Sequence, residues 1–474
     1  MKPIDGTCQK KPNILWIMTD QQNFQMMSCA GNPYVSTPNM DWIAEEGIRF
    51  ENAYCANPLC IPSRLGMITG TYPGQYGVRR NEDRPSPKPW PSQVLLDNGV
   101  GKLMKEAGYR AVYGGKEHFP GMRAEDLGFE YLTADEREEL AAVSAEFIRN
   151  YQDEQPFFLV TSFVNPHDIC FFAIDDASRP VFGEFVPLSE EEIRARRLPE
   201  DYNEREKNFG KKETEEMKKA SLIPPGMEEE EFFRTICPPL PDNYEIAEDE
   251  PEAIEIAITR RFFKKEAREN YSDEKWRLHR WCYKNLVELV DRQVGTVLSA
   301  LKDSGRWEDT VIIFVSDHGD IDGSHKLEHK EVLYEEAVHV PMIIKGTAGA
   351  PRGKTVNGIV QTGTDLLSTI FDYAGVTPPT YLKGISLKEA AETGVFSTDR
   401  TATVIEGEFG LAAVSETGKY VRYDLGERKE QYYDLATNRG EMYNQIQEEA
   451  FREEQERMKQ LLERHLKENG TCIP

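Results

Sequence analysis

Short apolar runs without alternation constrain the fold of this chain more than any other feature of its sequence. The runs are residues 13–18, 157–164, 311–315 and 340–344, and residues 109–113, which include Arg110, form a further short strand. A strand that is apolar at consecutive positions is buried on both faces, as in a parallel sheet covered by helices. Because stretches of helical periodicity separate the runs, we predict an α/β fold with a large, mostly parallel sheet sandwiched by helices.

Four of these strands are followed directly by polar residues. They are Asp20 and Gln21 after residues 13–18, Lys116 and His118 after residues 109–113, His167 after residues 157–164, and Asp317 and His318 after residues 311–315. In sheets of this kind, ligands bind outside the carboxyl ends of the strands. One such strand end is a common feature of any protein, but four together predict a single functional site.

The residue types at these strand ends indicate the chemistry. Asp20, Gln21 and Asp317 supply oxygen ligands, which suit a hard divalent cation such as Ca²⁺. The imidazole of His318 leaves Mn²⁺ as an alternative. Positive charge and proton donors come from Arg64, Lys116, His167 and Lys330. A cation surrounded by such side chains matches the transfer of a tetrahedral oxyanion group.

Cys60 stands just before a predicted helix. Pro62 lacks an N–H group and fits the first turn of a helix. A helix that begins there directs free N–H groups and the positive end of its dipole toward Cys60, which favours an anion beside the thiol. Arg64 adds a planar guanidinium. A buried cysteine before an ordinary helix explains the same residues equally well.

The segment Cys60-Ile61-Pro62-Ser63-Arg64, followed by Thr69-Gly70, resembles the signature of the type I sulfatases, whose fold is alkaline phosphatase-like. In that family a maturation enzyme oxidises the cysteine to Cα-formylglycine, so the resemblance implies this modification of Cys60. Ile61 departs from the family pattern, in which a small residue is usual. The spacing of the cysteine, the proline and the arginine is kept.

The resemblance also implies roles for individual residues. The positions that match metal ligands are Asp20, Gln21, Asp317 and His318, with Cys60 as a further ligand, and those that match sulfate-binding residues are Lys116, His167 and Lys330. His167 would also help to protonate the leaving group, and His118 would bind the formylglycine hydroxyl. Asn81 stands where the family often has a polar residue near the substrate. One hydroxyl of hydrated formylglycine would attack sulfur, and loss of the proton from the other would expel sulfate.

The implied activity is that of a sulfuric ester hydrolase acting on a sulfated carbohydrate. Gln21 and His318 are closer to the branch that includes phosphonate monoester hydrolases, so hydrolysis of phosphonate or phosphate mono- or diesters is the alternative. A catalytically silent binding protein for sulfated glycans is a third hypothesis. Equal ligand binding by the wild type and Cys60→Ala, without turnover in either, would support it.

The chain is expected to divide into a catalytic region, residues 1–385, and a C-terminal subdomain, residues 386–474. Short alternating strands and a charged helix near residues 448–467 predict a small antiparallel sheet with a helix against it. Within the catalytic region, residues 181–274 carry alternating acidic and basic clusters and several prolines. We interpret them as a mainly solvated, partly helical insertion near the mouth of the site.

The charge balance excludes some classes of partner. The 474 residues carry a net charge of −25 and a sequence pI near 4.9, which disfavours nucleic acid and anionic membrane surfaces as partners.

The eight cysteines form no CxxC pair, so no zinc or disulfide framework is expected. No run is long enough to span a bilayer, and residues 1–11 are polar. We expect a cytoplasmic protein, or a periplasmic or secreted one if a signal peptide has been removed.

Overall fold

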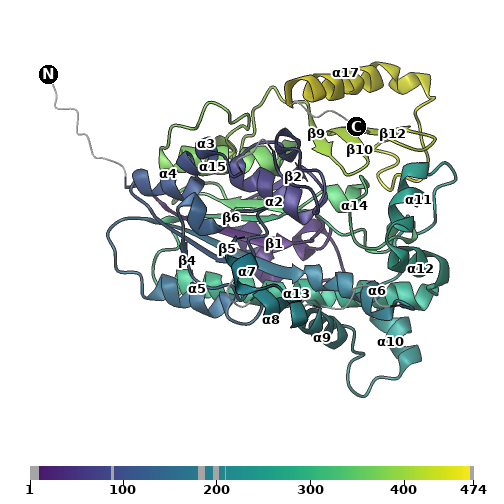
Figure 1. Ribbon diagram of the computed structural model, residues 1–474, viewed down its shortest axis with the longest axis horizontal. Helices are drawn as coiled ribbons and strands as arrows, with labels where there is room; N and C mark the ends of the chain where they lie inside the picture. The colour runs from purple at the N-terminus through teal and green to yellow at the C-terminus, as the bar shows by residue number, and fades with distance from the viewer. Residues whose placement is uncertain (1–9, 87–89, 180–186, 196–201, 209, 470–474) are drawn as a thin grey trace.

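The centre of the protein is an eight-stranded sheet (Figure 1). The computed structural model describes residues 10–86, 90–179, 187–195, 202–208 and 210–469. The strands are β1 (Asn13–Asp20), β2 (Ile48–Tyr54), β3 (Arg110–Gly115), β4 (Glu130–Tyr131), β5 (Phe157–Pro166), β6 (Thr310–Ser316), β7 (Met342–Lys345) and β8 (Lys354–Gln361). They lie in the order β4-β3-β5-β1-β6-β7-β2-β8. Only β7 runs antiparallel to its neighbours, so the predicted mostly parallel sheet is confirmed.

Helices cover both faces of this sheet (Figure 1). In the catalytic region they are α1 (Pro38–Glu45), α2 (Cys60–Thr69), α3 (Gln93–Asp97), α4 (Val100–Glu106), α5 (Leu140–Arg149), α6 (Cys170–Asp176), α7 (Glu190–Ala195), α8 (Tyr202–Asn208), α9 (Lys211–Ala220), α10 (Glu229–Thr235), α11 (Glu252–Thr259), α12 (Phe262–Asn270), α13 (Asp273–Asp303), α14 (Glu335–Val338), α15 (Thr362–Ala374) and α16 (Lys388–Thr393). Successive residues of β1 point to opposite faces of the sheet and pack against different helices. Trp16 packs into a cluster with residues of α2, α4 and α15, whereas Leu15 and Ile17 pack with α1, α5 and α13.

Three strands of the large sheet, β2, β4 and β8, were not predicted, and β7 runs against the expected direction. In β2 the buried residues Ile48 and Phe50 alternate with the half-buried Arg49 and Glu51. The edge strand β4 has only two residues, and the first half of β8, the other edge strand, is mostly exposed. Strands near a sheet edge are not buried on both faces, so they lack the continuous apolar run by which the central strands are recognised.

A second, antiparallel sheet lies beside the first and carries the C-terminal helix (Figure 1). Its elements are β9 (Ala402–Glu406), β10 (Gly410–Ser415), β11 (Gly418–Tyr423), β12 (Glu430–Asp434) and α17 (Arg452–Asn469). Met458 and Leu462 of α17 pack on Leu411, Tyr420 and Tyr432 of the sheet. The predicted small antiparallel sheet with a helix is therefore confirmed, whereas the boundary at residue 385 stays a prediction.

The prediction of a mainly solvated insertion is wrong for its last part. In α11 the side chains of Ala253, Ile254, Ala257 and Ile258 are buried and belong to the largest hydrophobic cluster. In the sequence, acidic residues stand between these apolar residues and obscure their helical spacing. This spacing gives α11 an apolar face that packs on the catalytic region. Residues 181–186, 196–201 and 209 of the insertion lie outside the described residues.

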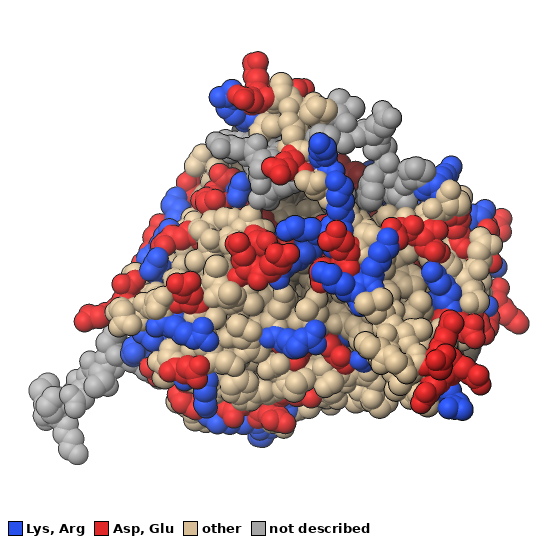
Figure 2. Space-filling view, turned by 90° about the horizontal axis from the view of Figure 1, so that it is seen from below, with Lys and Arg blue, Asp and Glu red and all other residues tan. Residues whose placement is uncertain are grey.

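The surface carries acidic and basic side chains interleaved over the face shown in Figure 2. The six cysteines that the structure describes are free thiols. Among the described helices, none is both long and apolar enough to cross a membrane.

Candidate active site

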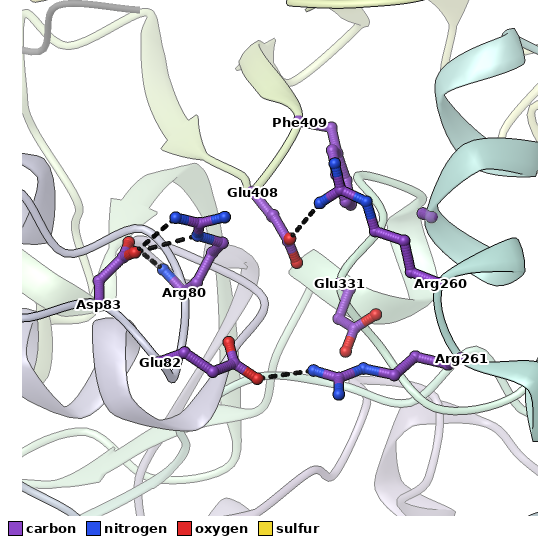
Figure 3. A pocket seen from close by; sticks show the side chains of 9 residues that line it. Arg80, Glu82, Asp83, Arg260, Arg261, Glu331, Glu408 and Phe409 are labelled. Carbon is purple, nitrogen blue, oxygen red and sulfur yellow. Dashed lines mark hydrogen bonds and ion pairs between the residues drawn. The ribbon is translucent and has the colours of Figure 1, made fainter. Parts of the chain in front are cut away.

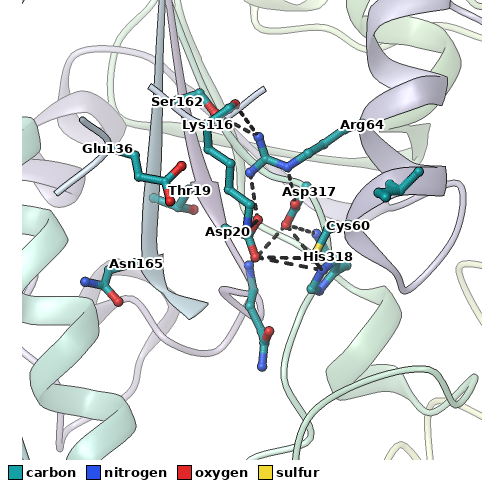
Figure 4. A network of polar contacts seen from close by, with 12 residues as sticks. Thr19, Asp20, Cys60, Arg64, Lys116, Glu136, Ser162, Asn165, Asp317 and His318 are labelled. Atoms are coloured by element: carbon teal, nitrogen blue, oxygen red, sulfur yellow. Dashed lines mark hydrogen bonds and ion pairs between the residues drawn. The ribbon is translucent and has the colours of Figure 1, made fainter. Parts of the chain in front are cut away.

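The predicted strand ends meet in one buried cluster (Figure 4). Strands β1 and β6 are parallel neighbours in register, with Thr19 opposite Ser316. Their carboxyl ends therefore place Asp20 and Asp317 side by side. Cys60 opens α2 and is only 1% exposed.

Four side chains converge tightly enough to hold a metal ion. They are Asp20, Cys60, Asp317 and His318, whose potential ligand atoms all lie within 4.8 Å of one another. The Sγ atom of Cys60 is 3.1 Å from Nε2 of His318 and 3.6 Å from Oδ1 of Asp20. The Nδ1 atom of His318 lies 2.9 Å from the carbonyl oxygen of Gly319, which directs Nε2 into the cluster. Two carboxylates and an imidazole in a buried site fit a divalent cation.

Arg64 fixes the two carboxylates. Figure 4 shows its guanidinium reaching from α2 toward both aspartates. Nε donates to Oδ2 of Asp317 at 2.7 Å, and Nη2 donates to Oδ2 of Asp20 at 2.8 Å. Nη1 donates to Oγ of Ser162 at 2.8 Å. Nη1 also donates to the carbonyl oxygen of Lys116 at 2.9 Å, so four of the five N–H groups of Arg64 have partners. Arg64 therefore orients the candidate ligands and has no pair of free donors for a substrate.

Two lysines surround the thiol with positive charge. Nζ of Lys330 lies 3.1 Å from Sγ of Cys60, and Nζ of Lys116 lies 2.8 Å from Oδ2 of Asp20. Burial and Asp20 oppose ionisation of Cys60, but Lys330, His318 and Lys116 outweigh them and hold the thiol pKa well below its usual value. A group with negative charge is therefore stabilised at position 60.

His167 adds a neutral imidazole beside the two lysines. Burial, together with Lys116 and Lys330, lowers the pKa of its imidazole to about 3. Its Nδ1 atom has no hydrogen-bond partner among the described residues. The next residue, Asp168, accepts a hydrogen bond from Arg137 at 2.6 Å, which holds this turn in place. A neutral imidazole with a free nitrogen can exchange a proton with a bound group.

Three predicted site residues are placed differently from the others. The amide of Gln21 is occupied: its oxygen accepts from Lys330 and Cys170, and its nitrogen donates to Asp320 at 2.6 Å. Asn81 accepts a hydrogen bond from the backbone N–H of Ile61 at 3.1 Å, so it supports the first turn of α2. His118 is exposed, and the described part of the chain offers it no hydrogen bond or ion pair. The structure thus does not bring His118 into the cluster.

Several residues of the site were missed by the sequence reasoning. Ser162 lies inside an apolar strand, where a lone hydroxyl gives no functional signal. Cys170 and Asp320 both hold the amide of Gln21, and both are buried. The position of Asp320 three residues after Asp317, in the same turn, was the one available signal.

Comparison with known proteins identifies the family. The model of the family described as Sulfatase matches residues 12–376, and a second, described as N-sulphoglucosamine sulphohydrolase, C-terminal, matches residues 323–468. The chain belongs to the sulfatase family. It is a sulfatase, an enzyme that hydrolyses sulfuric esters, and the resemblance seen in the sequence is confirmed.

Individual relatives agree with this assignment. A Δ4,5-hexuronate-2-O-sulfatase of Bacteroides thetaiotaomicron is 26% identical over 92% of this sulfatase and 85% of the relative. The solved structure of a 2-O GAG sulfatase matches with a TM-score of 0.73 and 24% identity, covering 97% and 93% of the two chains. A phosphonate monoester hydrolase of Agrobacterium radiobacter matches with a TM-score of 0.67 and 20% identity, covering 97% and 96%. Both structural matches establish the shared alkaline phosphatase-like fold.

Proposed function

We propose that this sulfatase removes sulfate from a sulfated carbohydrate, with position 60 as the nucleophile after conversion to formylglycine. The observation that carries the proposal is the burial of Cys60 against Asp20, Asp317 and His318, with Nζ of Lys330 3.1 Å from its Sγ atom and Lys116 paired with Asp20. The carbohydrate follows from the relative described as a hexuronate sulfatase and from the structure described as a GAG sulfatase.

The cluster of Asp20, Asp317 and His318 fits a divalent cation next to position 60. We infer Ca²⁺, with Mn²⁺ as the alternative that the imidazole leaves open. Bound there, the cation and the hydrated aldehyde would together supply an acidified hydroxyl group. Gln21 is one residue from Asp20, and its engaged amide orients the strand end in this proposal.

The side chains around position 60 would bind the sulfate and manage its protons. Lys116 and Lys330 carry positive charge that neutralises the sulfate oxygens as negative charge develops on them. His167 has an unpartnered Nδ1 and a pKa near 3, so it is neutral at pH 7 and readily passes on a proton that it receives. In this proposal His167 would take up the proton that the attacking hydroxyl releases and pass it to the departing alcohol, or Lys330 would supply that proton.

The proposal is tested with protein produced together with a formylglycine-generating enzyme. We expect release of inorganic sulfate from sulfated sugars and the mass change of thiol to aldehyde in the peptide that contains Cys60. Cys60→Ala should lose at least about a thousandfold in kcat/KM, because no nucleophile remains. Cys55→Ala is the matched control, since Cys55 is also buried but lies outside the cluster.

Two outcomes would overturn the proposal. One is equal sulfate release by Cys60→Ala and the wild type. The other is a higher kcat/KM on phosphonate monoesters than on every sulfated sugar tested, which would favour the alternative activity. The similarity to a phosphonate hydrolase at 20% identity supports only a common fold.

A further inference from the structure

Before any conversion to formylglycine, position 60 brings a thiol into the buried cluster of carboxylates and imidazole. Cys60, Asp20, Asp317 and His318 each offer one ligand atom, and these four atoms lie within 4.8 Å of one another. A thiolate is a soft ligand and, together with an imidazole, favours Zn²⁺, whereas Ca²⁺ is bound by oxygen atoms. The unconverted chain therefore presents a different kind of metal site from the converted one.

The spacing of the four ligand atoms fits a tetrahedral zinc ion. Sγ of Cys60 lies 3.1 Å from Nε2 of His318 and 3.6 Å from Oδ1 of Asp20. Nε2 of His318 lies 4.0 Å from Oδ1 of Asp20 and 3.7 Å from Oδ1 of Asp317. A tetrahedron built with the usual zinc–ligand bond lengths has edges of about 3.3–3.6 Å. Small shifts of the side chains would therefore bring all four atoms to bonding distance of one ion.

Neighbouring groups already hold these ligands in orientation. Nδ1 of His318 lies 2.9 Å from the carbonyl oxygen of Gly319, which leaves Nε2 for an ion. Arg64 donates to Oδ2 of Asp20 and to Oδ2 of Asp317, so Oδ1 of each carboxylate remains on the side of the imidazole. Contacts of this kind around the ligands fix their orientation and raise the affinity of zinc sites.

The thiolate also completes the charge balance of the site. Two carboxylates and a thiolate carry three negative charges, which match the positive charges of Arg64, Lys116 and Lys330 in contact with them. Conversion to hydrated formylglycine replaces the sulfur with hydroxyl oxygens, which ionise less readily than a thiol. The soft ligand is then lost, and the oxygen atoms that remain suit Ca²⁺.

The acidic pocket in Figure 3 offers no comparable site. It has a volume of about 300 Å³ and lies between the loop at residues 80–83, the junction of α11 and α12, and the turn between β9 and β10. Each of its carboxylates already has a basic partner: Asp83 pairs with Arg80, Glu82 with Arg261, Glu408 with Arg260 and Glu331 with Lys264. No cysteine or histidine stands among its described lining residues.

We propose that the unconverted chain binds Zn²⁺ at this cluster through the thiolate of Cys60, and that conversion to formylglycine switches the preferred metal from Zn²⁺ to Ca²⁺. On binding, the thiol releases its proton to the solvent and its sulfur bonds to the ion. The switch rests on the proposed function, because it needs the conversion, whereas the zinc site does not. The metal content of a preparation would then report how much of the protein has been converted.

The test uses full-length protein produced without a maturation enzyme and freed of metal with a chelator. Zn²⁺ and Ca²⁺ are titrated by calorimetry, and Co²⁺, a spectroscopic substitute for Zn²⁺, by absorbance. We expect a thiolate-to-Co²⁺ charge-transfer band and the intense visible bands of a tetrahedral ion. Cys60→Ser, which replaces sulfur with oxygen, should lose the charge-transfer band and bind Zn²⁺ at least about a hundredfold more weakly. Its affinity for Ca²⁺ should stay within about threefold of the wild type.

Two control variants address other sources of binding. Cys55→Ala removes a buried free thiol outside the cluster, and Glu408→Gln removes a carboxylate of the acidic pocket. Both should bind Zn²⁺ and Co²⁺ as the wild type does. Protein produced together with a formylglycine-generating enzyme should bind Zn²⁺ as weakly as Cys60→Ser does and should prefer Ca²⁺.

Two results would overturn the zinc site: equal Zn²⁺ affinity of the wild type and Cys60→Ser, or a Co²⁺ spectrum of the wild type without the charge-transfer band. The spectrum needs no variant, so the test does not depend on the folding of Cys60→Ser. A preference for Zn²⁺ that persists after conversion would overturn the switch. No turnover is measured in these titrations, so absence of sulfate release by converted protein contradicts the proposed function and not the zinc site.

Discussion

Replacing Arg64 with methionine removes the positive charge that stabilises the carboxylates of Asp20 and Asp317. Asp20 would keep Lys116 at 2.8 Å, but Asp317 would lose the one arginine or lysine with which it forms an ion pair among the described residues. Burial and Asp20 already raise the pKa of Asp317 to about 6, against the opposing effect of His318 and Arg64. Without Arg64, the carboxylate of Asp317 would keep only the imidazole of His318, at 3.7 Å, to offset its charge.

The expected magnitude follows from the geometry. The Nε–Oδ2 contact of 2.7 Å joins two side chains that are both 0% exposed. Removing one partner of such a buried pair costs about 3–5 kcal/mol. We therefore expect the metal-free variant to lose about that much free energy of unfolding in urea denaturation followed by tryptophan fluorescence.

Adding a divalent cation should restore part of this loss. A bound Ca²⁺ brings two positive charges to the carboxylates that have lost one, and no nearby guanidinium opposes it. The gain in unfolding free energy on adding CaCl₂ should therefore be larger for Arg64→Met than for the wild type. Arg137→Met is the control: it breaks the buried pair with Asp168 at 2.6 Å, away from the cluster, so its response to Ca²⁺ should equal that of the wild type. A smaller Ca²⁺ gain in Arg64→Met than in the wild type would refute the reasoning.

Three further predictions concern residues around the site. Burial, with Arg268 and Lys419, lowers the pKa of His325 to about 3, below its unfolded value of about 6.5, so the neutral form stabilises the fold and stability falls as the pH drops below 6.5. Between pH 7 and pH 5, His325→Asn should therefore lose about 2 kcal/mol less than the wild type in urea titrations, and an unchanged pH slope would count against this. Lys419→Met should destabilise the protein by about 3–5 kcal/mol in the same assay, because it leaves Glu335 and Glu441 buried without their shared partner, and a change below about 1 kcal/mol would argue that these carboxyls are neutral. His118→Ala should change stability by no more than about 0.5 kcal/mol, since the side chain is exposed, whereas a loss of kcat without a loss of stability would restore the role that the family resemblance gives it.

The central strands and the polar residues after them were predictable because the signal is local. In β1 all eight residues are buried, and Asp20 is its last residue. A continuous apolar run indicates burial on both faces, and the carboxyl edge of a parallel sheet gathers the residues at the end of each strand. The carboxylate and imidazole side chains that could bind a metal ion in the cluster were therefore predictable from the sequence.

The strands near the sheet edge and the insertion were harder to predict. In the sequence of α11, acidic residues alternate with the apolar residues that pack on the core, and only the contacts of that face show that it is buried. The position of β7 between two antiparallel partners depends on a reversal of chain direction that no local pattern encodes.

The sequence by itself determined which chemical groups this sulfatase brings to the carboxyl edge of its sheet. Only the tertiary structure decided what each of them contacts. Arg64 faces two carboxylates rather than open space, and Asn81 holds the first turn of α2. The pocket that unites Arg260, Glu331 and Glu408 joins segments far apart in the chain. A local pattern can fix burial and strand direction, but contacts between distant side chains depend on how whole elements pack, and that is settled only when the chain folds.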